Sequence, residues 1–543
     1  MKSHPHESTP LLIATHPSRA SDEKLPTGFL GEKGEDLPEI IAGEDISLSV
    51  FEEAWLIFKI GLPNVMQQLS GYGVTISSLV LVGRLAGPQQ LGGIAVGSTF
   101  GSMVGSTILL GLSEGIDTLS SQAYGRKCYH LMLEILLRGI ILLFIVASID
   151  AAIFYNSEKI FLYLGQTVDM AKIASNYVRF LIPGTYGYAL SLAFQRYLSA
   201  QGVTRPLWYV SGFTLPIHIM VTYYLVGVLK LGERGAAAAW SITHILRGLV
   251  LVIFTVQMKM SNSVVVQTNV CARLSSSSNN GYPAPTSPPQ SKSGTVIIAA
   301  AASLRGWNQM LAISVPAVSM LACEFWAFEV LVLMAGTLPN PDVQVISMTI
   351  ILNITALIFM FSSGVSMAVC VRVGANLGAG RGEGPKKILK AAIVVFLLQW
   401  LVVCIILLLP GIRTQLPLLF APPSTTKAIV GGICFTMVVI QQLFDGLKEI
   451  MNGMLRGAGK QSLGLVTSII AYFIICLPLA YVLAFKHFCH EQQENCFLPR
   501  GVPGLVLACT TASLIHAILN GCVIFIHINW LKEAQRLKST NAT

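Results

Sequence analysis

The sequence predicts an all-α, polytopic membrane protein with twelve transmembrane helices in two six-helix lobes. The chain of 543 residues is 53% hydrophobic and only 12% charged. Its mean hydropathy is +0.65, and apolar windows of about 20 residues recur along most of its length. A water-soluble protein of this length would need far more charge on its surface. The 48 glycines agree with a membrane protein, because small residues let membrane helices approach closely.

We expect transmembrane helices near 55–83, 88–113, 131–155, 173–200, 206–229, 233–258, 307–337, 344–372, 388–410, 429–455, 463–486 and 503–527. Each is long enough to cross about 30 Å of hydrocarbon as an α-helix. Because the number is even, both termini lie on the same side of the membrane. With both in the cytosol, the cytosolic segments carry about 21 Lys and Arg and the opposite side about 9, as the positive-inside rule requires.

The basic loops also account for the formal net charge of +9, so we expect no nucleic-acid partner. The 11 cysteines show no paired metal spacing, and most lie in predicted spans, where a thiol behaves as a small apolar group. No phosphate-binding loop, zinc motif or nucleophile elbow is found. The sequence therefore predicts neither an enzyme, nor a metal site, nor a cofactor, and its partners are small molecules and the lipid bilayer.

Composition divides the chain into five segments. Residues 1–50 are polar and rich in Pro and Gly, and 259–305 contains SSSSNN followed by GYPAPTSPPQSKSG. We expect a disordered cytosolic tail and a flexible cytosolic linker there, because neither segment can bury enough apolar surface to fold. The two lobes lie at 51–258 and 306–530, and a cytosolic tail follows at 531–543.

A short pattern in the N-terminal tail bears on localisation. Glu7-Ser-Thr-Pro-Leu11-Leu12 resembles the acidic dileucine signal that directs membrane proteins to vacuoles or lysosomes. We therefore predict a vacuolar or lysosomal membrane or the plasma membrane, and the sequence leaves the choice open.

The two lobes resemble duplicated copies. Three patterns recur in the same order about 250 residues apart, which is not easily chance. They are Pro63 and Gly83 with Pro316 and Gly336, Ser113-x-Gly115 with Ser362-x-Gly364, and Gln195-x-x-Leu198-x-x-x-Gly202 with Asn452-x-x-Leu455-x-x-x-Gly459. Six spans per copy give both copies one orientation, and transporters built in this way bind substrate at the repeat interface near the midplane.

Ionisable residues inside the spans indicate where chemistry takes place. Glu324 and Glu329 lie near the middle of an apolar segment from Pro316 to Gly336, and Asp445 and Lys448 lie in span ten. Charge at bilayer depth is costly, so such residues face a partner or a wet cavity and are usually functional. Acids in an otherwise apolar helical bundle are typical of a proton- or cation-coupled transporter, and the alternative is a neutral Glu hydrogen-bonded between helices.

The spacing of these residues constrains their directions. Glu324 and Glu329 point about 140° apart around a helix, so we expect Glu324 to bind protons or substrate and Glu329 to be a second site or a packed group. Gln441, Asp445, Lys448 and Asn452 share one helical face, which we expect to line the central cavity. A structural ion pair between Asp445 and Lys448 is the alternative. In a further hypothesis, Lys448 tunes the proton affinity of Asp445 and is displaced when a cationic substrate binds.

Other polar and aromatic residues are weaker candidates for the cavity. Gln67, Gln68 and Asn353 could offer polar contacts, and Trp326 could bind an organic cation by a cation–π contact, although aromatics in membrane helices more often only pack. We expect Asp117 to organise a cytosolic loop with Arg126.

Several motifs resemble the eukaryotic branch of the multidrug and toxic compound extrusion (MATE) family over nearly all of residues 50–535. They are Gly115-Ile-Asp-Thr-Leu-Ser-Ser-Gln-Ala-Tyr-Gly125, Glu324-Phe-Trp-Ala-Phe-Glu329, Val371-Arg-Val-Gly-Ala-Asn-Leu-Gly-Ala-Gly380, Leu443-Phe-Asp445, and Gly453-x-Leu-Arg-Gly-x-Gly-x-Gln461. The resemblance implies two lobes that open alternately to either side. It also implies export or sequestration of organic, often cationic, compounds in exchange for protons, with Glu324, Glu329 and Asp445 as the coupling carboxylates.

The chain departs from the family pattern in three places, one of which is Asn353 in span eight, where some animal members carry Glu and the plant-like branch also has Asn. Gly71 to Gly83 contains no acid where many bacterial members carry an Asp, which argues against sodium coupling there, and the family does not explain Lys448. The alternative function is a lipid-linked precursor flippase of the same architecture, although such a protein needs basic rather than acidic cavity residues. A receptor or scaffold would need no buried acids. We expect a monomer.

Overall fold

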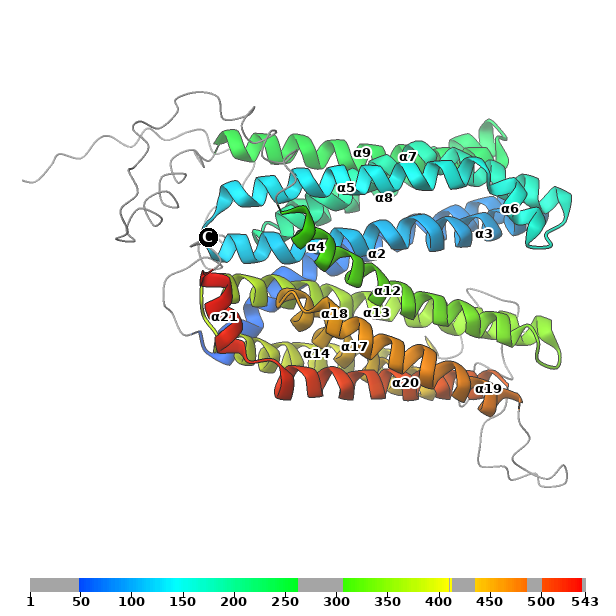
Figure 1. Ribbon diagram of the computed structural model, residues 1–543. Helices are drawn as coiled ribbons and strands as arrows, with labels where there is room; N and C mark the ends of the chain where they lie inside the picture. The colour runs from blue at the N-terminus through cyan, green and yellow to red at the C-terminus, as the bar shows by residue number, and fades with distance from the viewer. Residues whose placement is uncertain (1–47, 262–305, 410, 413–434, 486–500, 540–543) are drawn as a thin grey trace, which may run out of the picture. The chain divides into compact units, whose positions relative to one another are not determined.

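The protein is described by a computed structural model over residues 48–261, 306–409, 411–412, 435–485 and 501–539 (Figure 1). Every regular element within these ranges is a helix, which confirms the predicted all-α class. Most of the predicted N-terminal tail and linker lie outside the described residues. We use "N-half" for residues 51–258 and "C-half" for residues 306–530.

The helices of the N-half follow one another with short connections. They are α2 (Val50–Leu85), α3 (Pro88–Gly101), η1 (Ser102–Ser106), α4 (Thr107–Gly125), α5 (Tyr129–Tyr155), α6 (Ser157–Tyr163), α7 (Val168–Ala200), α8 (Arg205–Thr222), η2 (Tyr223–Val228) and α9 (Gly232–Ser261), where η denotes a π-helical turn.

The described residues of the C-half are also helical. Its helices are α12 (Trp307–Ala335), α13 (Pro341–Gly378), α14 (Gly384–Leu408), α17 (Phe435–Gly457), α18 (Gln461–Ser468), η6 (Ile469–Cys476), α19 (Leu477–Phe485), α20 (Val502–Cys522) and η7 (Val523–His527), followed by α21 (Trp530–Ser539).

The described part of every predicted span coincides with a helix or a continuous helical run, which confirms the predicted membrane fold. Ten helical runs within the described residues are long and apolar enough to cross a membrane. The two predicted spans outside this set are α7 and α17. Helix α17 is not apolar enough to be in this set, because four charged residues lie within its 23 residues. They are Asp445, Lys448, Glu449 and Arg456. This polar helix is the one that carries the candidate site.

Local sequence features explain where α2 begins and how α2 and α12 accommodate internal prolines. Ser49 caps α2 by a capping box, in which its hydroxyl accepts from the backbone amide of Glu52 and the Glu52 carboxylate accepts from the Ser49 amide. Pro63 in α2 and Pro316 in α12 stand inside their helices at corresponding positions of the two halves. Membrane helices tolerate such prolines because neighbouring groups satisfy the freed carbonyl.

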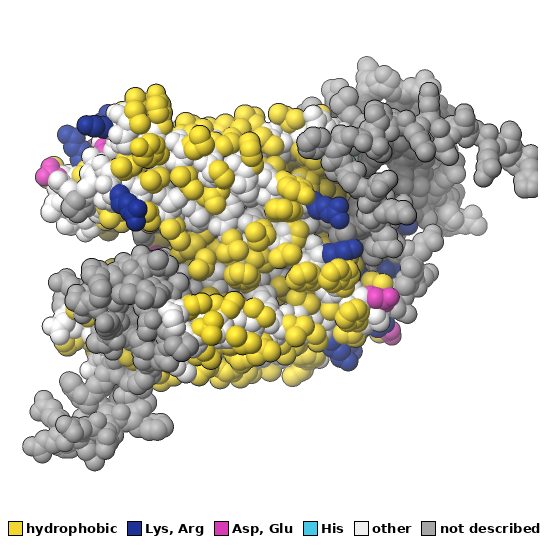
Figure 2. Space-filling model, turned by 180° about the vertical axis from the view of Figure 1, so that it is seen from behind, with side chains coloured by type: hydrophobic (Ala, Val, Ile, Leu, Met, Phe, Trp, Pro, Cys, Tyr) yellow, Lys and Arg dark blue, Asp and Glu magenta, His cyan; other side chains and the backbone are white. Residues whose placement is uncertain are grey.

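The surface shows where the lipid lies. Large apolar side chains are exposed on many helices, for example Phe213 at 71% and Ile526 at 82%. On the face seen in Figure 2, apolar side chains form a broad band and the Lys and Arg side chains gather toward its ends. This distribution is that of a helical bundle surrounded by hydrocarbon.

Helices from both halves pack against each other. In the N-half, α2 contacts α13 and α14 of the C-half, and α4 contacts α12 and α13 (Figure 1). Glycines permit the close approach of α2 and α13, since a Cβ built on Gly61 would lie 3.4 Å from the Gly364 carbonyl oxygen. Gly364 belongs to one of the repeated sequence patterns, so a packing role accounts for it.

The residues after span twelve are not simply a tail. Helix α21 packs against α13 through buried Trp530, Ala534 and Leu537. The Lys460 ammonium lies 2.6 Å from the Glu533 carboxylate, which ties α21 to the turn after α17. Sequence analysis predicted no helix here, because ten residues give too short a pattern.

Candidate functional site

The centre of the C-half holds a buried cluster of three charged side chains from two helices. Glu324 on α12 and Asp445 on α17 are 8% and 1% exposed, and Lys448 on α17 is completely buried. The Lys448 ammonium forms an ion pair with Glu324 and lies 3.1 Å from Asp445 Oδ1. The ion pair between Asp445 and Lys448 considered in the sequence analysis is therefore present, and Glu324 binds the same ammonium.

Neighbouring helices complete the surroundings of this cluster. Lys448 Nζ donates to the Tyr472 hydroxyl at 3.2 Å, and Ser513 Oγ donates to Asp445 Oδ1 at 3.2 Å. The ammonium also lies 5.1 Å from the centroid of the Phe359 ring and 5.7 Å from that of Tyr472. Two carboxylates, the Tyr472 side chain and the Phe359 ring thus stabilise one buried cation.

The polar face of α17 continues toward its C-terminus. Asn452 Nδ2 donates to Glu449 Oε2 at 3.2 Å, and Asn520 Nδ2 donates to Asn452 Oδ1 at 2.8 Å. Thr467 Oγ1 in turn donates to Asn520 Oδ1 at 2.6 Å. These bonds link two buried amides and a hydroxyl from three helices, α17, α20 and α18, and fix the rotation of α17.

At the end of α17, Arg456 joins the two halves. Its guanidinium donates to Glu449 at 2.8 Å and to Glu114 on α4 of the N-half at 2.6 Å. Thr118 Oγ1 donates to the Arg456 carbonyl at 3.0 Å, and Gln122 Nε2 donates to the Gly457 carbonyl at 3.0 Å. The α4–α17 contact is therefore held by one ion pair and two backbone-directed hydrogen bonds.

A second ion pair joins the halves between α2 and α13. The Arg372 guanidinium donates from Nε to Glu53 Oε1 at 2.7 Å and from Nη2 to Glu53 Oε2 at 2.9 Å. Both side chains are buried, at 3% and 4% exposure. Such two-point pairing is the strongest geometry available to an Arg–carboxylate pair.

The polar stripe of α17, formed by Gln441, Asp445, Lys448 and Asn452, is buried in this structure. Gln441, Lys448 and Asn452 are 2%, 0% and 2% exposed. The hydrogen bonds of Lys448 and Asn452 go to other residues of the C-half. The stripe packs inside because opposite charges and amides compensate one another there, which sequence spacing alone did not show.

The two carboxylates of α12 have different environments. Glu324 is paired with Lys448, whereas Glu329 is half-buried and makes no hydrogen bond or ion pair within the described residues. Trp326, two positions from Glu324, is 43% exposed. It lies about 200° from Glu324 around the helix and so points away from the buried cluster.

The remaining candidates lie where α2 meets α13. The Tyr72 hydroxyl donates to Asn353 Oδ1 at 2.7 Å, and Gln68 Nε2 donates to Ser363 Oγ at 3.1 Å. Gln67 is buried, and its Oε1 has no hydrogen-bond partner within the described residues. Gln68 and Asn353 thus belong to the contact between the halves.

Asp117 has a different partner from the one predicted. Its carboxylate lies 3.6 Å from the guanidinium of Arg196 on α7, and both side chains are buried. Arg126 stands nine positions further along, and a helix rises about 13 Å over that distance. The longitudinal separation explains why the nearer Arg196, from a different helix, forms the pair.

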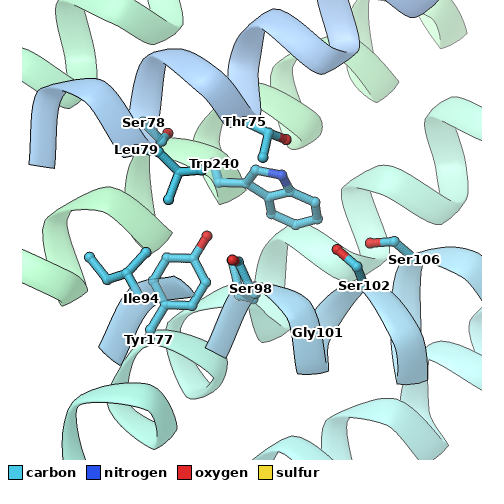
Figure 3. Close-up of a pocket in the computed structure, with 11 residues that line it drawn as sticks. Thr75, Ser78, Leu79, Ile94, Ser98, Gly101, Ser102, Ser106, Tyr177 and Trp240 are labelled. Carbon is cyan, nitrogen blue, oxygen red and sulfur yellow. The ribbon is translucent and has the colours of Figure 1, made fainter. Parts of the chain in front are cut away.

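The N-half contains a small cavity between α2, α3, η1, α7 and α9 (Figure 3). Its volume is about 40 Å³, and its lining includes the hydroxyls of Ser78, Ser98, Ser102 and Ser106 and the ring of Trp240. That volume suits water rather than an organic molecule. Sequence analysis did not identify this cavity, because its lining residues come from separate helices.

Sequence reasoning also missed Glu53, Glu114, Arg372 and Arg456 as interacting groups. Glu53 and Arg372 are separated by 319 residues along the chain, and Glu114 and Arg456 by 342 residues. The available signal was that each is a charged side chain near a span end or within a span. Their pairing follows only from how the helices assemble.

Comparison with known proteins places this arrangement in a family. A family model described as MatE matches residues 63–224 and again residues 316–482. The second match begins at Pro316 and the first at Pro63, the two prolines that the repeat analysis paired. The duplication of the chain is thereby confirmed.

Similar proteins and structures agree with this match. Protein DETOXIFICATION 16 of Arabidopsis thaliana is 29% identical over 514 residues, which cover 94% of this chain and 95% of that relative. Protein DETOXIFICATION 17 of the same plant is 29% identical over 511 residues, covering 94% and 97%. The crystal structure of the eukaryotic MATE transporter AtDTX14 has a TM-score of 0.75 at 26% identity and covers 91% of this chain and 99% of its own.

The helical membrane fold, the duplicated halves and these matches define a membrane transporter of small molecules, not an enzyme. The chain belongs to the MATE family, as the twofold family match and the similarity along nearly its whole length show. An outward-facing MATE transporter of the MOP superfamily shares the fold, with a TM-score of 0.69 at 15% identity.

Proposed function

We propose that this protein is a secondary active antiporter that exports or sequesters organic, often cationic, compounds in exchange for protons. The observation that carries the proposal is the sharing of one buried ammonium, that of Lys448, by the carboxylates of Glu324 and Asp445. Buried ionisable groups of this kind are expensive to maintain in a membrane and usually take part in transport.

The charge balance of the cluster supports exchange. With both carboxylates ionised, Glu324, Asp445 and Lys448 together carry one net negative charge, which a proton or an organic cation can neutralise. Two ligands that neutralise the same charge exclude each other, and mutual exclusion between cargo and proton is the requirement for antiport. By thermodynamic linkage, each ligand weakens the binding of the other by the same factor.

Lys448 has a defined place in this exchange. Its ammonium already occupies the position between the two acids that a cationic cargo would use. We propose that cargo displaces the ammonium toward Tyr472 and Phe359, whose rings already lie near it. Glu329 is proposed as a second coupling carboxylate, because it is half-buried in the span and has no described partner.

The coupling ion is proposed to be the proton rather than sodium. The segment from Gly71 to Gly83 of α2 carries no acid, so the N-half lacks the span-one carboxylate of the bacterial family members. The acidic C-half cluster also favours cationic cargo over a phosphate-bearing lipid precursor, which needs basic groups.

The test is transport by the purified full-length protein in proteoliposomes. An imposed pH gradient should drive exchange of organic cations from a compound panel, and a sodium gradient of equal size at constant pH should not. The variant Glu324→Gln serves as the matched control, because it keeps the side-chain volume and removes the charge. Equal uptake with and without the pH gradient would overturn proton coupling, and transport confined to lipid-linked precursors would favour a flippase.

We further propose that the protein works as a monomer in the vacuolar or lysosomal membrane or the plasma membrane, with both termini in the cytosol. The supporting observations are the excess of Lys and Arg in the predicted cytosolic segments and the dileucine-like pattern from Glu7 to Leu12.

A further inference from the structure

Five arginines are buried within the described residues, and four of them have a carboxylate partner. Arg138 pairs with Glu134, Arg196 with Asp117, Arg372 with Glu53, and Arg456 with Glu114 and Glu449. The fifth, Arg247, is 4% exposed and forms no ion pair with any described residue. It lies near the middle of α9, where a guanidinium without a counter-charge is unfavourable.

The hydrogen bonds of Arg247 leave most of its donors unused. Nη2 donates to Thr214 Oγ1 on α8 at 3.1 Å. Nε is buried and has no described acceptor, and Nη1 makes no hydrogen bond within the described residues. A guanidinium offers five N–H donors in a planar fork, so this side chain is prepared for an acceptor that the described protein does not provide.

Space for such an acceptor lies beside Gly71 of α2. Among the described residues, a Cβ built on Gly71 would have one heavy atom of another helix within 4 Å, Arg247 Nη1 at 4.0 Å. The next residue, Tyr72, hydrogen-bonds to Asn353 of the C-half. The open side of the guanidinium is therefore close to the contact between the two halves.

Among the described residues, the titratable side chains close to Arg247 are His218, His244 and Tyr188, and none of them is acidic. His218 is engaged on both ring nitrogens, with Ser78 Oγ at 2.8 Å and Thr243 Oγ1 at 2.9 Å. The centroid of the His244 ring lies 4.1 Å from that of Trp240, with the rings tilted, and 5.0 Å from that of Tyr188, edge to face. The surroundings are polar or aromatic, and the local charge is positive.

We propose that Arg247 is an anion-binding residue that takes the carboxylate of an organic ligand beside Gly71. A carboxylate matches the planar fork in geometry and compensates one positive charge. A phosphate dianion would bring two negative charges to a site with one guanidinium. The site lies in the N-half, apart from the acidic cluster of the C-half, and its occupancy does not depend on proton coupling.

The first experiment measures stability without transport. The thermal unfolding midpoint of the full-length protein in detergent is followed while acetate replaces chloride at constant ionic strength. We expect acetate to raise the midpoint of the wild type and to leave that of Arg247→Met unchanged. Equal midpoints in acetate and chloride for the wild type would overturn a carboxylate site.

A matched substitution separates ligand binding from folding. Arg247→Met removes an unpaired charge, so in chloride it should unfold at or above the wild-type temperature. Arg372→Met leaves Glu53 buried without a partner and should unfold at a lower temperature. If Arg247→Met is destabilised as strongly as Arg372→Met, the guanidinium serves the fold and the proposal is wrong.

The second experiment uses two fluorescent probes that differ only in a free carboxylate, rhodamine B and its ethyl ester. Binding is measured by fluorescence anisotropy with the detergent-purified protein. Arg247→Met should weaken rhodamine B binding by roughly 10- to 100-fold, since hydrogen bonds to charged groups are worth that much. Binding of the ester should change by less than about twofold, and Arg247→Lys should be intermediate. Equal losses for both probes would contradict carboxylate recognition.

Discussion

Arg372 on α13 and Glu53 on α2 form a buried two-point ion pair, with N–O distances of 2.7 and 2.9 Å, across the contact between the N-half and the C-half. Both residues lie near the predicted cytosolic ends of their helices. The pair therefore ties the halves together on that side of the membrane, and helices α2 and α13 can separate there only if it breaks.

Removing one member of this pair should destabilise the protein more than removing both. Glu53→Gln leaves a buried guanidinium without a counter-charge, and we expect a loss of about 3–5 kcal/mol in the free energy of unfolding. The double variant with Met at positions 53 and 372 should recover much of that loss.

The measurement is a double-mutant cycle on thermal unfolding of the full-length protein. The exposed pair Glu158–Arg179, at 41% and 36% side-chain exposure, supplies the control. Glu158→Gln should change stability by no more than about 1 kcal/mol. Additive effects at positions 53 and 372 would show that the buried pair contributes no coupling.

Proton-driven transport should depend on the C-half acids. Glu324→Gln and Asp445→Asn each remove a carboxylate from the shared cation, and we expect both to abolish pH-driven efflux while the protein still reaches the membrane. Efflux from proteoliposomes under an imposed pH gradient is the measurement. Near-normal rates in both variants would show that coupling lies elsewhere.

Lys448 should stabilise the folded protein, because its charge compensates the carboxylates of Glu324 and Asp445. Lys448→Met leaves Glu324 and Asp445 facing each other without a cation, so we expect a lower unfolding temperature. Adding Glu324→Gln to this variant removes one of the two opposed charges and should restore part of the loss. Lys448→Arg keeps the charge and should be milder, although its larger fork must fit beside Phe359 and Tyr472.

The same unfolding series tests the alternative that Lys448 and Glu324 contribute to stability independently. If Lys448→Met and Glu324→Gln have strictly additive effects, the two side chains do not depend on each other, and the shared-cation description fails.

The predicted topology can be checked independently of transport. Reporter fusions at residue 280 and after Thr543 should both report the cytosol, because an even number of spans separates the tails and the linker follows span six. A fusion at residue 230, between α8 and α9, should report the opposite side. Reporters at 280 and 230 on the same side would show that the span count is wrong.

The sequence alone determined the class of fold, and the reason is physical. A hydrocarbon solvent allows only helices whose backbone groups are satisfied internally, or closed barrels, so length and hydropathy suffice to locate the spans. The duplication was readable because proline and glycine positions constrain the backbone locally. The acids Glu324 and Asp445 stood out because charge is rare in such spans.

Tertiary structure decided which charges meet. The i, i+3 spacing of Asp445 and Lys448 on one helix allowed their pairing to be considered, but the third member, Glu324, comes from another helix 124 residues away. The pairs of Glu53 with Arg372 and of Glu114 with Arg456 span more than 300 residues. That Arg247 has no carboxylate partner among the described residues is likewise visible only once the neighbouring helices are placed. Helix periodicity tells which way a side chain points along its own helix, whereas packing determines which helix it meets, and that information is not local in the chain.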